Sequence, residues 1–162
     1  MLGIIRFELK IRIKMFISEL IMKKAVKRNG YYEFIGSTKL VNKYGIEKCG
    51  AVYLNSSIYI IWDKEFYNDL TPPQRLFCRF HELGHFNGYT SITEFMSHER
   101  KLNEEVKADS FAFKRMGYDN ALNAMIGILE YLDEIQQTEM RQRINIQKSM
   151  NIVKQAVRDN TL

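Results

Sequence analysis

The sequence is poor in cysteine and proline. Cys49 and Cys78 are the two cysteines among 162 residues, and their spacing is not that of a CxxC pair. Two cysteines are too few for a disulfide framework, and free thiols fit a reducing cytoplasm. With two prolines and nine glycines, the chain has no low-complexity tract and no repeat of fixed period.

Long hydrophobic runs are also missing. In the opening segment, MLGIIRFELKIRIKMF, charged side chains interrupt every apolar stretch. None of these stretches approaches the roughly 18 apolar residues of a membrane-spanning helix, and the segment does not have the form of a secretory signal. The composition, 46% hydrophobic and 27% charged, is typical of a globular protein. We therefore expect a cytoplasmic protein without a membrane span.

The charge is unevenly distributed. Residues 1–50 contain eleven lysines and arginines against four acidic residues, whereas residues 51–162 contain thirteen against fifteen. A basic N-terminal third is able to contact nucleic acid or an acidic membrane surface. A solvated basic face is the simpler interpretation, because the sequence has none of the motifs of nucleic-acid-binding domains. Nucleic acid is therefore not an expected partner.

The first half of the chain is predicted to contain a helix and a small sheet. Residues 15–28 have a helical apolar stripe that ends at Asn29-Gly30, and the preceding residues are ambiguous. A short strand and a short helix over Lys39–Tyr44 are expected next. Residues 51–62, AVYLNSSIYIIW, have two β-branched and aromatic runs around a turn sequence, which predicts a hairpin.

A helix with clear start and stop signals is predicted next. Thr71 is able to cap it, and proline is favoured at the first helical position, here Pro72. Gln74 stands three residues after Thr71, as in a capping box. The helix should run from Pro72 to about Phe86, and Gly88 should end it.

The rest of the chain is predicted to be helical after a polar connection over residues 89–100. Gly117 should end the first of these helices, and Asp119 should cap the next. The expected helices cover residues 102–116, 120–135 and 138–157. The last two are expected to pack as an antiparallel pair over the core.

The helix that starts at Pro72 carries the sequence HELGH. His81 and His85 are four residues apart and share one helical face, where two imidazoles are able to bind one metal ion. Glu82 projects to another side, where it is able to reach a metal-bound water as a general base. Gly84 weakens a helix and indicates close packing against another segment. The alternative is an amphipathic helix with two solvent-facing histidines.

A second helix offers a third ligand. Glu105 and Asp109 share one helical face, twenty and more residues after His85. Catalytic zinc sites use three protein ligands and leave the fourth position to water, and two histidines with a glutamate are one of the known ligand sets. Glu105 is therefore the predicted third ligand, and Asp109 is predicted to orient His81 or His85 through a ring N–H. Glu104 is a neighbouring candidate without an aspartate four residues later, and a solvated acidic face is the alternative.

HELGH followed by EEVKADSFAF resembles the gluzincin metallopeptidases, whose pattern is HExxH…ExxxD. The second segment is similar to the E-x-x-A-D-x-F-A stretch of the M48 family and of the related ImmA/IrrE-type cytoplasmic peptidases. MGYDNALNAMIGILEYL resembles the helix that follows this stretch in the family. The resemblance covers roughly residues 50–132 and is to a minimal soluble member. Residues 1–30 and 138–162 lie outside it.

The resemblance implies a zincin-like α+β fold, in which a small antiparallel or mixed sheet packs on the HExxH helix and on the helix that bears the glutamate. Residues 1–29 would be a basic N-terminal extension, and residues 30–162 a metallopeptidase domain with a C-terminal helical pair. It also implies one zinc ion per chain, Glu82 as general base and acid, and Asp109 beside a ligand. The implied zinc ligands are His81, His85 and Glu105. The edge strand of the hairpin would bind an extended peptide.

The sequence is compatible with three functions. The first is a zinc metalloendopeptidase that hydrolyses peptide or protein substrates. The second is a non-catalytic zinc-binding module that binds a protein partner, and the third is a basic nucleic-acid-binding protein with an incidental HELGH. His98 and Tyr89 are weak candidates for a donor to the oxyanion of peptide hydrolysis, with ordinary surface residues as the alternative. The aromatic residues expected in the core are Trp62, Phe77, Phe80 and Phe86.

Overall fold

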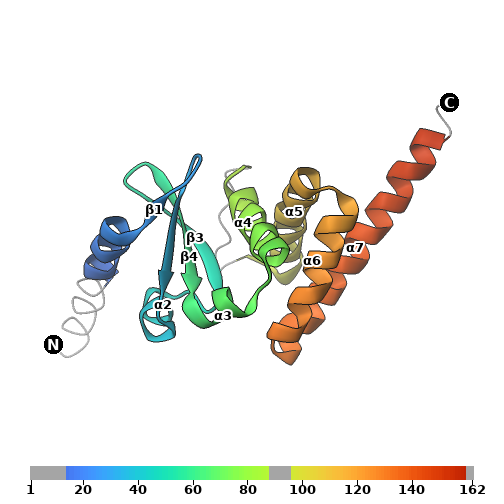
Figure 1. The fold of residues 1–162 in the computed structure, drawn as a ribbon. Coiled ribbons are helices and arrows are strands. Elements are labelled where there is room, and N and C mark those ends of the chain that lie inside the picture. Colours follow the sequence, from blue (N-terminus) through green and yellow to red (C-terminus); the bar gives the residue numbers. More distant parts are fainter. Residues whose placement is uncertain (1–13, 88–95, 160–162) are drawn as a thin grey trace. The chain divides into compact units, whose positions relative to one another are not determined.

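A computed structural model describes residues 14–87 and 96–159 (Figure 1). The chain forms two compact units, Met1–Asp69 and Leu70–Leu162. The expected α+β class is confirmed, because a small mixed sheet is accompanied by helices. The assignment of residues 1–29 and 30–162 to an extension and a domain stays a prediction.

The first unit contains one four-stranded sheet. Its strands are β1 (Val26–Lys27), β2 (Tyr32–Gly36), β3 (Cys49–Leu54) and β4 (Ser57–Asp63). Their order in the sheet is β1-β2-β4-β3, with β2 and β4 parallel and both outer pairs antiparallel. Parallel neighbours need a long crossover connection, and the chain between β2 and β4 includes the helix α2 (Thr38–Tyr44).

The hairpin predicted over residues 51–62 is confirmed as β3 and β4. Its two-residue turn consists of Asn55 and Ser56, whose φ angles are 45° and 61°. Positive φ at both turn residues matches the twist of the flanking strands. Trp62 is fully buried, as predicted for a core residue. A short helix after β4, α3 (Lys64–Asp69), was not predicted.

One face of this sheet is covered by α2 and by a helix over residues 14–24. Both helices contribute to a single apolar cluster with side chains of β2 and β4. Its buried members are Ile17, Ile21, Phe34, Val41, Tyr59 and Ile61.

The helix predicted over residues 15–28 is wrong beyond residue 24. Val26–Lys27 pairs with β2 as a strand, and the Arg28 amide donates a 2.8 Å hydrogen bond to the Tyr31 carbonyl. Gly30 adopts a φ of 89° within this turn. An Asn-Gly pair is a hairpin turn as readily as a helix stop, and strand pairing decides between the two.

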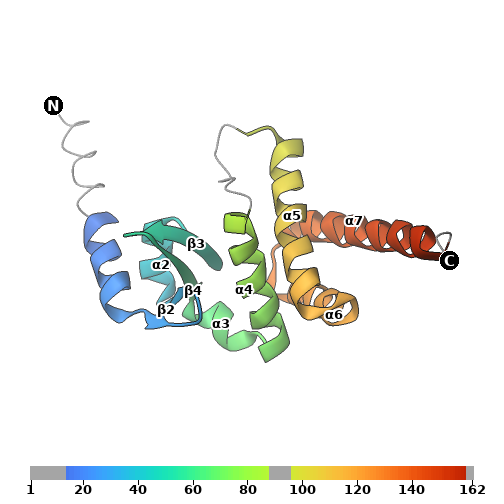
Figure 2. The same cartoon turned by 90° about the horizontal axis from the view of Figure 1, so that it is seen from above.

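The second unit is helical. Its elements are α4 (Pro72–Asn87), α5 (His98–Met116), α6 (Tyr118–Ile128), η1 (Leu129–Tyr131) and α7 (Glu134–Asp159). Helix α5 contacts α4, α6 and α7, and lies between α4 and α7 in both views (Figures 1 and 2). Among the described residues, none of the helices combines the length and the apolar character needed to cross a membrane.

The start of α4 is as predicted. The Gln74 side chain accepts hydrogen bonds from the Thr71 amide at 2.7 Å and from the Thr71 hydroxyl at 2.9 Å. These contacts provide a partner for a backbone N–H at the helix start, as in a capping box. The predicted stop at Gly88 lies outside the described residues.

The remaining helix boundaries differ from the prediction in three places. Helix α5 begins at His98 instead of residue 102, because Ser97 caps it with a hydroxyl that accepts from the Arg100 amide at 3.3 Å.

Helix α6 begins directly after Gly117, so Asp119 is not its cap. The chain leaves the helical conformation after η1, and Asp133 caps α7 by accepting from the Gln136 amide at 2.9 Å. Helix α7 contacts α6, the helix with which it was predicted to pair, and it also contacts α5.

Candidate metal centre

Helices α4 and α5 approach each other closely at Gly84. A Cβ atom at this position would lie 2.7 Å from the Ala108 Cα and 2.8 Å from the Ala108 carbonyl oxygen. Atoms of a real side chain do not come so near a backbone, so only glycine permits this contact without a shift of one helix. The close packing expected from Gly84 is confirmed, and it brings side chains of α4 within reach of α5.

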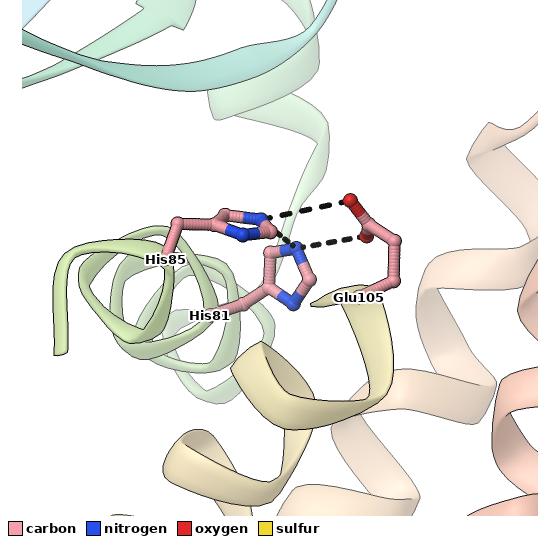
Figure 3. Close-up of side chains that lie close together, drawn as sticks. All are labelled: His81, His85 and Glu105. Carbon is pink, nitrogen blue, oxygen red and sulfur yellow. Dashed lines mark hydrogen bonds and ion pairs between the residues drawn. The ribbon is translucent and has the colours of Figure 1, made fainter. Parts of the chain in front are cut away.

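Two histidine rings of α4 point toward α5. The Nε2 atoms of His81 and His85 are 3.2 Å apart, and the ring planes are nearly perpendicular (Figure 3). His81 is 9% exposed and His85 is partly buried. The alternative of two solvent-facing histidines is therefore wrong.

Glu105 of α5 faces both rings. Its Oε2 atom is 3.2 Å from the His81 Nε2, and its Oε1 atom is 3.6 Å from the His85 Nε2 (Figure 3). Glu104 is also buried, but its carboxylate accepts a 2.8 Å hydrogen bond from Lys107. The packing of α5 on α4 thus presents Glu105, and not its neighbour, to the histidines.

Asp109 contacts His81 and not His85. The Asp109 Oδ1 lies 2.8 Å from the His81 Nδ1, and Asp109 is completely buried. A carboxylate only accepts hydrogen bonds, so the His81 Nδ1 must carry the proton. The Nε2 atom of His81 therefore faces His85 and Glu105, which is the orientation that a metal ligand needs.

Arg143 of α7 completes the cluster and was not among the predicted site residues. Its Nη1 atom lies 2.9 Å from the Glu105 Oε2. Its Nε atom donates to the Asp109 Oδ2 at 2.7 Å, and its Nη2 donates to the Asp109 Oδ1. A signal was present, because Arg143 follows Met140 by three residues and so lies on the side of α7 that carries its apolar residues. An arginine at a buried position requires a carboxylate partner.

The histidines and Glu105 have strongly shifted pKa values. Burial lowers the pKa of His81, but the hydrogen bonds to Asp109 and Glu105 outweigh burial and raise it to about 10. Burial and the charge of His81 lower the pKa of His85 to about 4. Burial raises the pKa of Glu105, but hydrogen bonding to His81 and the charge of His81 lower it to about 2. At neutral pH, His81 is therefore an imidazolium, His85 is neutral and Glu105 is ionised.

The outer groups stay charged. Burial raises the pKa of Asp109, but the adjacent Arg143 charge lowers it below the usual range. Burial lowers the pKa of Arg143, but the charges of Asp109, Glu105 and Glu82 raise it above the usual range. The cluster is thus a network of alternating charges around two imidazole rings.

The remaining predicted residues lie at different places. Glu82 is half-buried beside His81 in α4, and its charge acts on Arg143, so it is within electrostatic reach of the cluster. His98 is exposed at the first residue of α5, about two helical turns before Glu105. Tyr89 lies outside the described residues. The roles proposed for these three side chains stay predictions.

The donor atoms of His81, His85 and Glu105 fit a single metal ion. One ligand atom from each residue lies within 4.8 Å of the others. Zinc bonds of about 2.0–2.1 Å at tetrahedral angles separate neighbouring donor atoms by about 3.3–3.4 Å. The 3.2 Å between the two Nε2 atoms and the 3.2 Å between the His81 Nε2 and the Glu105 Oε2 are close to that value, and the second oxygen of Glu105 lies 3.6 Å from the His85 Nε2. Nitrogen and carboxylate oxygen donors in this ratio suit zinc.

Comparison with known proteins identifies no relative. A scan against protein-family models, a search of curated proteins and a search of solved structures each found no match. Function is therefore inferred from the geometry and chemistry of the cluster.

Proposed function

We propose that the protein is a zinc-dependent metallopeptidase of the gluzincin type, with a zincin-like fold and one zinc ion per chain. The observation that carries the proposal is the convergence of His81, His85 and Glu105, which bring one donor atom each within 4.8 Å of one another. Two of these residues belong to HELGH, so a glutamate in the position of a general base accompanies the ligands.

Each neighbouring side chain has a defined task in peptide hydrolysis. A zinc ion bound there would supply a Lewis acid that lowers the pKa of water to about 7 and polarises the peptide carbonyl. Glu82 takes the proton from the attacking water and returns it to the leaving amine. Asp109 accepts the Nδ1 proton of His81 and thereby directs the Nε2 lone pair of this ring toward the other ligands.

The substrate proposed is an extended peptide segment. Strand β3 is the outer strand of the sheet, so one of its backbone edges lacks a partner strand among residues 14–87 and 96–159. An extended peptide is able to add to such an edge through main-chain hydrogen bonds, which place few demands on side chains.

Two measurements test the proposal. Elemental analysis of purified protein should find about one zinc per chain, and His85→Ala should reduce it sharply. Glu82→Gln should keep the zinc but lower the cleavage rate of a peptide library by about 10²–10⁴-fold, which is the usual contribution of a general base. Absence of zinc from the wild type, even after zinc is supplied, would overturn the proposal. Bound zinc without any cleavage would favour the non-catalytic module.

A further inference from the structure

Arg143 lies outside the HExxH…ExxxD pattern but contacts its members. It follows Asp109 by 34 residues and belongs to α7, a different helix from either ligand-bearing helix. Its side chain is 12% exposed. A buried guanidinium with several carboxylate contacts fixes the orientation of the carboxylates that it contacts.

The Arg143 guanidinium contacts the carboxylates of Asp109 and Glu105 at the same time. It donates to both oxygens of Asp109 and contacts the Oε2 atom of Glu105. That Oε2 is also the oxygen 3.2 Å from the His81 Nε2. Paired N–H donors in a planar fork set the orientation of a carboxylate more strictly than a point charge does. Arg143 thus orients Glu105 directly and His81 through Asp109.

Helix α7 holds this arginine firmly against α5. One turn after Arg143, the Gln147 amide donates a 3.0 Å hydrogen bond to the Val106 carbonyl of α5. Met140 and Ile144 are buried on the same side of α7. These anchors before and after Arg143 place its guanidinium without requiring a bound metal ion.

We propose that Arg143 is a positioning residue that sets the affinity of the cluster for zinc by holding Glu105 and Asp109 in the binding orientation. The inference rests on the proposed function only in that the cluster binds zinc. Because the guanidinium is engaged by two carboxylates, Arg143 acts through them and does not itself touch the substrate.

The positive charge of Arg143 and its role in orienting carboxylates predict opposite effects on zinc affinity when Arg143 is replaced. A cation beside a metal site repels the metal, so loss of the charge alone would tighten zinc binding. Loss of orientation would weaken it, and partners of metal ligands typically contribute 10- to 100-fold, or about 1.4–2.7 kcal/mol, to affinity. The sign of the measured change therefore distinguishes the two roles.

The test compares Arg143→Lys, Arg143→Met and a control, Arg141→Met. Arg141 is exposed on the same helix and contacts Gln137 through a hydrogen bond. Zinc dissociation constants are measured by competition with a chelator on metal-free proteins that melt cooperatively. Both Arg143 variants should bind zinc about 10-fold or more weakly, and the control should match the wild type. The Co²⁺ absorption spectrum should change in both Arg143 variants, because the ligand geometry changes.

Other outcomes of these zinc measurements would overturn either the positioning role of Arg143 or the proposed function. Unchanged or tighter zinc binding by Arg143→Met, or full retention of affinity in Arg143→Lys, would overturn the positioning role while the peptidase proposal stands. If Arg143→Met does not fold, Arg143→Lys decides alone, since it keeps the charge and loses the fork. Failure of the wild type to bind zinc would instead overturn the proposed function.

Discussion

Zinc binding should displace one proton from His81 over a wide range of pH. In the metal-free cluster, the proton on the His81 Nε2 points at Glu105, and the pKa of His81 is about 10. A metal ion needs the lone pair of this nitrogen, so binding must displace the proton. His85, with a pKa of about 4, and Glu105, with a pKa of about 2, are already deprotonated at neutral pH.

The pH dependence of zinc affinity follows from the pKa of His81. Three pH units separate pH 7 from the His81 pKa of about 10, so competition by the proton weakens zinc binding at pH 7 about a thousandfold relative to the deprotonated site. The dissociation constant should fall about tenfold per pH unit between pH 6 and 7, and more steeply above pH 7, where the zinc-bound water also loses its proton. Two ordinary histidines, with pKa values of about 6.5, would themselves release almost no protons above pH 7.5, so that only the proton of the zinc-bound water would be released there.

Titration calorimetry at pH 8 in two buffers of different ionisation enthalpy measures the number of protons released. About two protons per zinc are expected for the wild type, one from His81 and most of one from the zinc-bound water. Asp109→Asn removes the charge that helps to raise the pKa of His81, so this variant should release fewer protons than the wild type at pH 8. Release of one proton or fewer by the wild type at pH 8 would refute the charge network described for the cluster, because the bound water alone accounts for about one.

Two further predictions concern the packing of α4 on α5. Gly84→Ala should lower the free energy of unfolding by about 1–3 kcal/mol in denaturant titrations, because its Cβ would collide with the backbone at Ala108; an increase, as expected from helix propensity alone, would contradict this contact. Glu105→Gln should lose zinc in elemental analysis, whereas Glu104→Gln, whose parent side chain pairs with Lys107, should retain it; equal retention by both variants would rule out Glu105 as a ligand.

Turn and capping residues predicted most of the secondary structure. The prediction was wrong where pairing with a distant strand selects the conformation. The β3–β4 hairpin and the start of α4 followed from turn and capping residues, which act on their immediate neighbours. Asn29-Gly30 was interpreted as a helix end because both interpretations are locally allowed. Pairing of Val26–Lys27 with β2, which no local pattern reports, selected the turn.

The sequence by itself determined which residues share a helical face. His81 and His85, and likewise Glu105 and Asp109, are four residues apart, and the helical period places each pair on one side. Only the tertiary structure decided that these two faces meet, since this depends on the approach of two helices at Gly84.

The tertiary structure also decided which other side chains join the cluster. It turned Glu105 toward the histidines and Glu104 toward Lys107, and it directed Asp109 to His81. Arg143 entered from α7, 62 residues after His81. The rotation of one helix against another is set by how whole surfaces pack, and the periodicity within a single helix carries no record of its partner.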